Sequence, residues 1–233
     1  MPNLSTLKML IVSALWAGLW AGLLLTAVQR IQVIPTLLQA EVYEQQAANH
    51  SHADNQTHTH EAESWQPQNG SERTFFTAVA NISLGVGFAL LLGAVGTLRG
   101  GIGGWRNGLL WGLAGYAAFF VAPSLGLPPE VPGTEAANLN ARQLWWLMTV
   151  FDTALGLWLL VFAKTHLNKL FGAVLLISPH VIGAPQPEIH GSVAPAELAH
   201  SFIVASAFAN AVFWLALGGL MGWFSGKKQA VKN

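Results

Sequence analysis

Long apolar stretches alternate with short polar segments along the chain. Six stretches carry at most one charged residue each, and five of them reach the length of about 20 residues that a helix needs to cross a bilayer. The fifth in order is shorter, and because it ends before Pro185 and Pro187 it is either a thin span or a re-entrant half-helix. The pattern predicts an all-α polytopic membrane protein with six transmembrane helices, at about residues 9–29, 74–98, 107–127, 143–163, 170–183 and 201–226.

Composition supports a membrane protein whose surface is mostly in contact with lipid. Of 233 residues, 52% are hydrophobic and only 9% are charged, against about 25% charged in soluble domains. A net charge of zero argues against a nucleic-acid partner. The absence of cysteine excludes disulfides and thiolate metal ligands. The chain has no GxxxxGK[ST] nucleotide-binding motif and no GxSxG or HExxH hydrolase motif, so we expect neither a nucleotide cofactor nor an enzyme.

Charge placement predicts the orientation of the spans. With six spans and both termini in the cytoplasm, only three cations lie outside, as the positive-inside rule favours. Ten of the eleven carboxylates then lie outside too. This acidic outer face either attracts cations to the protein or merely follows from membrane insertion. The outer cations are Arg30, Arg73 and Arg142, and the cytoplasmic ones are Lys8, Arg99, Arg106, Lys164, Lys169, Lys227, Lys228 and Lys232.

The chain contains an internal echo that suggests repeated helical hairpins. Proline, a Pro-Glu step and a closing glycine recur between residues 123–133 and 179–191, and at an offset of 58 Asp152 falls on Asn210. A fainter copy in the first hairpin ends at Asn81. Three repeats around an axis along the membrane normal would make Asn81, Asp152 and Asn210 the lining of a transport path. The alternative is that membrane hairpins share composition and Pro/Gly turns by default.

Asp152 is the strongest single signal, because a carboxylate near the middle of a span costs about 2.5–3.5 kcal/mol on insertion scales. It either serves a cation or proton, or holds a buried polar network for packing. The GxxxG spacings Gly18–Gly22, Gly104–Gly108 and Gly108–Gly112 predict close helix packing rather than chemistry.

Histidines and carboxylates form two candidate metal-binding regions. Imidazole and carboxylate ligands suit divalent cobalt, nickel, zinc or manganese, and the fifth outer loop is rich in both. The segment 30–73 is expected to be a flexible, His-rich outer loop that collects metal, or a solvated loop with incidental histidines. The candidates in the fifth loop are His180, Glu188, His190, Glu197 and His200, and those in the first are His50, His52, His58 and His60.

Several motifs together resemble the CbtA family of predicted cobalt transporter subunits. They are Pro-Pro-Glu-Val-Pro-Gly at 128–133, Ala-Arg-Gln-Leu-Trp-Trp at 141–146, the run from Ser178 to Gly191, and Pro-Ala-Glu-Leu-Ala-His at 195–200. The resemblance implies cobalt uptake linked to cobalamin synthesis in a bacterial inner membrane. It also implies a small single-span partner of the CbtB family. The CbtA family is commonly described with five spans, whereas the charges in this sequence favour six.

The sequence is compatible with two functions. The first is a permease subunit in which outer histidines gather cobalt, or nickel or zinc, and pass it along Asp152, Asn81 and Asn210. The second is a membrane scaffold that delivers metal to a partner protein without transporting it, with Asp152 in a structural role. With either function, the sequence leaves open whether the chain also forms a homo-oligomer.

Overall fold

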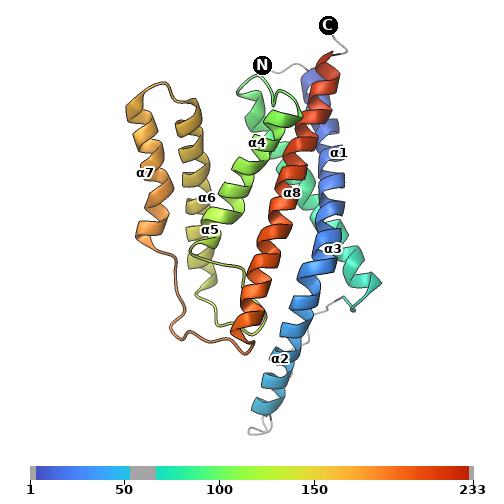
Figure 1. Ribbon diagram of the computed structural model, residues 1–233, viewed down its shortest axis with the longest axis vertical. Helices are drawn as coiled ribbons and strands as arrows, with labels where there is room; N and C mark the ends of the chain where they lie inside the picture. The colour runs from blue at the N-terminus through green and yellow to red at the C-terminus, as the bar shows by residue number, and fades with distance from the viewer. Residues whose placement is uncertain (1–3, 53–66, 231–233) are drawn as a thin grey trace.

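The computed structural model describes residues 4–52 and 67–230 as a bundle of helices (Figure 1). The described part contains one isolated β-bridge and no sheet, so the predicted all-α class is confirmed. Short π-helical turns, η1 and η2, join successive α-helices into longer rods. The elements are α1 (Leu4–Val28), η1 (Gln29–Val33), α2 (Ile34–His52), α3 (Ser71–Thr97), α4 (Trp105–Tyr116), η2 (Ala117–Val121), α5 (Ala122–Ser124), α6 (Leu139–Phe162), α7 (His166–Ile182) and α8 (Ala196–Ala230).

These elements form six helical segments, of which four are long and apolar enough to cross a membrane. The remaining two are the rod α4–η2–α5 and the short apolar helix α7, which has 17 residues. Successive segments run in opposite directions, so the start of α1 and the end of α8 lie at the same end of the bundle (Figure 1). The four long segments are Leu4–Ala47, Ser71–Thr97, Leu139–Phe162 and Ala196–Gly226.

The first rod continues well beyond the predicted end of its span at residue 29. Helix persists through η1 and α2 to His52, so the first part of the 30–73 segment is helical rather than loop. This helix continues past Pro35, although a proline lacks an N–H and normally interrupts a helix. The π turn just before it absorbs the defect, with the N–H of Ile34 bonded to the carbonyl of Gln29 five residues earlier.

Glycines set the distances between paired helices. A Cβ at Gly85 of α3 would lie 2.6 Å from the carbonyl oxygen of Gly18 in α1. Gly108 and Gly112 of α4 contact the backbone of α8 in the same way, so the predicted close packing at these GxxxG positions is confirmed. A further close contact joins α6 and α7, where a Cβ at Gly156 would lie 2.7 Å from the carbonyl oxygen of Gly172.

The helices do not pair in the order of the predicted hairpins. α1 packs against α3, but α4 packs against α8, and α6 packs against α7. The second and third hairpins therefore exchange partners. α8 also packs against α1, and its Phe213, Leu217 and Met221 join Ala17 and Ala21 of α1 in the main hydrophobic core. The α6–α7 pair makes few contacts with the other helices and lies at one side of the bundle (Figure 1).

The loops that connect the exchanged hairpins pair with each other. Thr134 and Ser192 form the isolated antiparallel bridge, and their hydroxyl oxygens lie 3.2 Å apart. The N–H of Glu135 donates to the carbonyl of Gly191, and that of Val193 donates to the carbonyl of Gly133. All these positions match at the 58-residue offset of the sequence echo, so the two loops meet as equivalent segments.

The α4–α8 contact gives a stability prediction. A Cβ at Gly218 would lie 2.6 Å from the backbone nitrogen of Gly112, whereas a Cβ at Gly219 would meet only the side chain of Leu109 at 3.2 Å. Gly218→Ala should therefore destabilise the protein by about 1–3 kcal/mol, because the helices must move apart. Gly219→Ala is the matched control and should have little effect. Thermal unfolding of the two purified variants in detergent measures the difference, and equal midpoints would contradict this packing.

Candidate functional site

Asp152 lies near the middle of α6 and contacts α7. α6 begins with Asn138 as its N-cap, whose side chain accepts from the N–H groups of Asn140 and Ala141. The Asp152 side chain is half-buried, and its Oδ2 accepts a hydrogen bond of 3.2 Å from Ser178 Oγ in α7. It has no salt bridge within the described residues. Within the described residues, the hydroxyl of Ser178 is thus the hydrogen-bond partner of the Asp152 carboxylate in this apolar helix pair.

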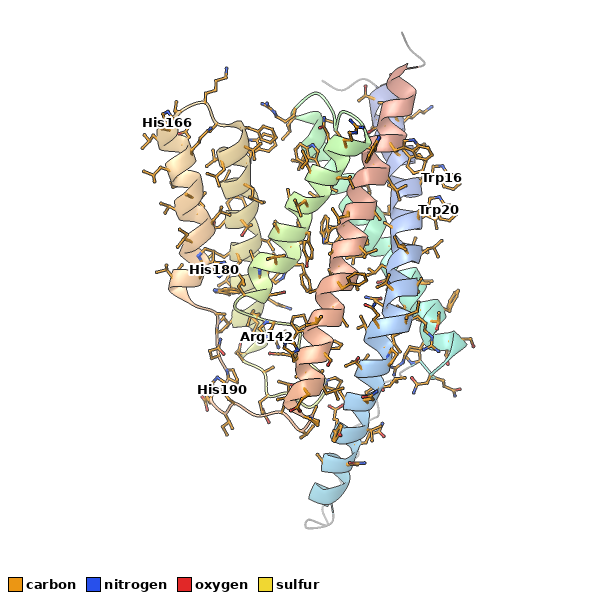
Figure 2. The ribbon with its side chains drawn as sticks, viewed as in Figure 1. Trp16, Trp20, Arg142, His166, His180 and His190 are labelled. Atoms are coloured by element: carbon orange, nitrogen blue, oxygen red, sulfur yellow. The ribbon has the colours of Figure 1, made fainter. Side chains whose placement is uncertain are left out.

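The α6–α7 contact carries a tryptophan and a histidine toward the end of α7. Trp145 is buried, and its indole N–H donates to the carbonyl of Pro179 over 3.2 Å. The ring of His180 meets the ring of Trp145 edge-on, with 6.2 Å between centroids. His180 itself is exposed and lies at the end of α7, while His190 lies in the loop that follows (Figure 2).

The predicted outer metal ligands do not form a preassembled cage. The side chains of His180, Glu188, His190 and His200 are all exposed, as is Glu197. Within residues 4–52 and 67–230, no three His, Asp or Glu side chains gather closely enough to hold a metal ion. Of the four predicted collector histidines, His50 and His52 belong to the last turn of α2, and His58 and His60 lie outside the described residues.

Asn81 lies in a buried polar cluster between α1 and α3. Its side chain is 8% exposed, and its Nδ2 donates to Thr26 Oγ1 at 3.0 Å and to Gln29 Oε1 at 2.7 Å. Gln29 is the first residue of the π turn. We did not single out Thr26 or Gln29 from the sequence. The available signal was their position as the last polar residues of an apolar stretch.

The three residues of the predicted path have separate partners. Asn210 is half-buried in α8, and its Nδ2 donates to the carbonyl of Ser206 in the same helix over 2.9 Å. Asn81 bonds to α1 and η1, and Asp152 bonds to α7. No hydrogen bond joins any two of these three side chains. The structure therefore gives each of them a local polar environment of its own.

Comparison with models of known protein families finds a match over most of the chain. The model of the family described as "Probable cobalt transporter subunit (CbtA)" matches residues 7–226. The chain belongs to the CbtA family. This is a family of transporter subunits rather than enzymes, and the word "subunit" implies a partner. Neither the proteins of curated function nor the solved structures that were compared match the chain.

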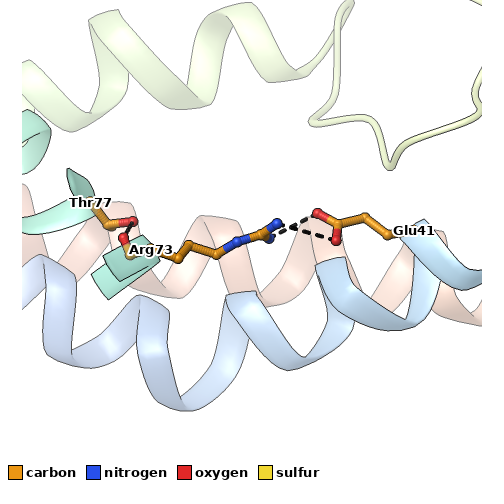
Figure 3. A network of polar contacts seen from close by, with 3 residues as sticks. All are labelled: Glu41, Arg73 and Thr77. Carbon is orange, nitrogen blue, oxygen red and sulfur yellow. Dashed lines mark hydrogen bonds and ion pairs between the residues drawn. The ribbon is translucent and has the colours of Figure 1, made fainter. Parts of the chain in front are cut away.

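Two arginines of this CbtA-family protein pair with glutamates at the end of the bundle opposite its termini. Arg73 in the first turn of α3 forms a two-pronged ion pair with Glu41 of α2, at 2.8 and 3.3 Å (Figure 3). Arg142 in the first turn of α6 pairs with Glu130 of the preceding loop at 2.8 Å. Two of the three cations predicted to lie outside are thus neutralised, while Glu44, Glu135, Glu188 and Glu197 are exposed. This end of the protein therefore presents a surplus of negative charge.

The Arg73–Glu41 pair fixes the start of α3 against α2 and gives a second prediction. Their side chains are only 17% and 25% exposed, so Arg73→Ala leaves a largely buried carboxylate without its partner. We expect a loss of about 1–2 kcal/mol in unfolding free energy. Adding Glu41→Ala should recover part of it, because the uncompensated charge disappears. Denaturant unfolding of the single and double variants measures the coupling, with the exposed Arg30→Ala as control. Additive losses would rule out a direct interaction.

Proposed function

We propose that this CbtA-family protein is the membrane subunit that carries cobalt across a bacterial inner membrane, in support of cobalamin synthesis. The observation that carries the proposal is the Asp152 carboxylate, set in a candidate span with Ser178 as its hydroxyl partner. A charge in hydrocarbon is costly and is retained where it serves a substrate or ion. Nickel and zinc are the alternative cargoes, because the same ligand types bind them.

The outer end of the protein gathers the cation in this proposal. The exposed glutamates there attract cations over the range of a Debye length. His50 and His52 at the end of α2, together with His58 and His60 farther along the chain, collect the metal. His180, Glu188, His190 and His200 then bind the metal in turn, coming together around the ion rather than forming a cage beforehand. From this entrance the ion passes Asp152, and Asn81 and Asn210 contribute amide dipoles along the path.

We further propose six spans with both termini in the cytoplasm. Support comes from the antiparallel order of the six segments, which puts the loops containing Arg99 and Lys164 at the same end as the start of α1. The matched loops at Thr134 and Ser192 support a true repeat of the second and third hairpins. The partner is a small single-span subunit of the CbtB kind, which joins this chain to make the complete transporter.

Cobalt accumulation tests the transport function. Cells that express the chain with its small partner should accumulate cobalt above cells that lack both. Asp152→Asn removes the charge while keeping size and hydrogen bonding, and uptake should fall at least about tenfold because an unbalanced cation would then have to cross low dielectric. Asn210→Asp added to Asp152→Asn should restore part of the uptake if the two positions are equivalent. Background uptake by the native chain with its partner would favour the alternative, a scaffold that delivers metal without transporting it, and normal uptake by Asp152→Asn would leave Asp152 with a packing role.

Reporter fusions test the proposed topology. A reporter joined after Asn233 should report the cytoplasm, and one inserted at Asn55 should report the outside. The reason is the distribution of cations, with eight of eleven on the cytoplasmic side of a six-span arrangement. A C-terminus on the outside would remove α7 as a span and transfer His190 to the cytoplasm.

A further inference from the structure

A proline inside α7 leaves a backbone carbonyl without its helical donor. In a continuous helix the carbonyl of Leu175 would accept from the N–H four residues later, but that residue is Pro179, which has none. Ser178 Oγ lies 3.0 Å from this carbonyl oxygen and donates to it. The side chain of the residue before the proline thus replaces the missing backbone donor.

The same hydroxyl lies 3.2 Å from Asp152 Oδ2. A serine hydroxyl has a single hydrogen to donate, so Ser178 bonds to only one of these two oxygens at a time. Three oxygens from α6 and α7 therefore meet around one hydrogen, and one of them belongs to a carboxylate. Such a surplus of acceptors is costly in an apolar environment. A cation bound between the three oxygens would remove this cost.

The end of α7 strengthens the attraction for a cation. α7 ends at Ile182, four residues after Ser178. The last carbonyls of a helix lack intrahelical donors and carry the negative end of the helix dipole. One of them, the carbonyl of Pro179, already accepts from Trp145 Nε1 and from the N–H of Gly183. Asp152 bonds to Ser178, about one turn before this negative terminus. A cation bound there would be attracted both by the carboxylate and by the helix dipole.

The other two prolines within helical rods are accommodated differently. Before Pro35 and before Pro123 the helix widens into the π turns η1 and η2, in which Ile34 and Ala122 donate to carbonyls five residues earlier. Neither proline is preceded by a hydroxyl residue. Among the three, only Pro179 has a serine before it and a carboxylate beside that serine. The oxygen cluster is therefore a feature of α6–α7 rather than of every proline in the fold.

We propose that Asp152, Ser178 and the carbonyl of Leu175 form a binding site for a divalent cation between α6 and α7. The inference rests on the transport function proposed above and names the ligands that would hold the ion where its path passes Asp152. The ligands are a carboxylate, a hydroxyl and a carbonyl oxygen, which manganese accepts readily and cobalt also binds. Toward the end of α7, His180 supplies the next ligand, against the ring of Trp145 that bonds to Pro179.

Pro179→Ala tests the site without removing any of its side chains. Alanine restores the N–H that donates to Leu175, so Ser178 turns entirely to Asp152 and the surplus of acceptors disappears. Ser178→Ala removes the hydroxyl itself. Pro123→Ala is the matched control, since it changes a proline in the equivalent rod where a π turn already compensates. Manganese bound to each purified variant is counted from the loss of the free-ion signal in electron paramagnetic resonance.

Pro179→Ala and Ser178→Ala should each weaken the binding of one manganese ion about tenfold, the factor expected for one lost polar ligand. Pro123→Ala should bind as the native protein does. Cobalt uptake by cells should fall with binding in the same two variants. Unchanged manganese binding in both would overturn the site, as would equal losses in Pro123→Ala, which would mark general loosening. The native chain and its partner could show no cobalt uptake while the two variants bind manganese more weakly than the native protein. In that case the site stands and the transport function fails.

Discussion

Three prolines inside the helical rods each remove the N–H donor that a backbone carbonyl would otherwise use. In hydrocarbon, a backbone carbonyl without a donor costs several kcal/mol, so each missing proline N–H must be compensated within the protein. Pro35 and Pro123 are compensated by π turns, which keep their rods continuous. Pro179 is compensated by the hydroxyl of Ser178. The first solution keeps a rod continuous, and the second links the backbone of α7 to the charge on α6.

The sequence could predict the class of fold and most of its spans, because long uncharged stretches and glycine spacings are local properties. Helix pairing was not predictable in the same way. The predicted hairpins join neighbours in sequence, yet Gly108 and Gly112 fit the backbone of α8, and Gly156 fits that of Gly172. Which small residue meets which backbone is settled by shape across the bundle. The extent of the first rod was also mispredicted, because the span was ended where the uncharged stretch ends, at Gln29, whereas the helix itself continues through the charged and polar residues that follow.

For the candidate site, the sequence indicated which residue types to consider but not how their side chains are arranged. Asp152 stood out because it is the single charge in a long apolar stretch. Its partner Ser178 had no comparable signal, since a serine before a proline is common in turns. The histidines at 180, 190 and 200 share an end of the molecule, as the spans require, but their side chains project separately from a helix end, a loop and another helix start. Sequence proximity on loops sets no distance between side chains, so a shared cage could not be inferred from it.

The exchange of partners between hairpins has a consequence for how the chain is made. Tyr116 in α4 donates its hydroxyl to the carbonyl of Ala207 in α8, 91 positions later. During synthesis α4 therefore enters the membrane long before the helix against which its glycines fit. Contacts of such separation close late and at a large entropic cost. α8 emerges after the other helices of the bundle, and α1, α3 and α4 all pack against it. Assembly of the core thus waits for α8, and until then the unpaired face of α4 depends on lipid or on the insertion machinery for cover.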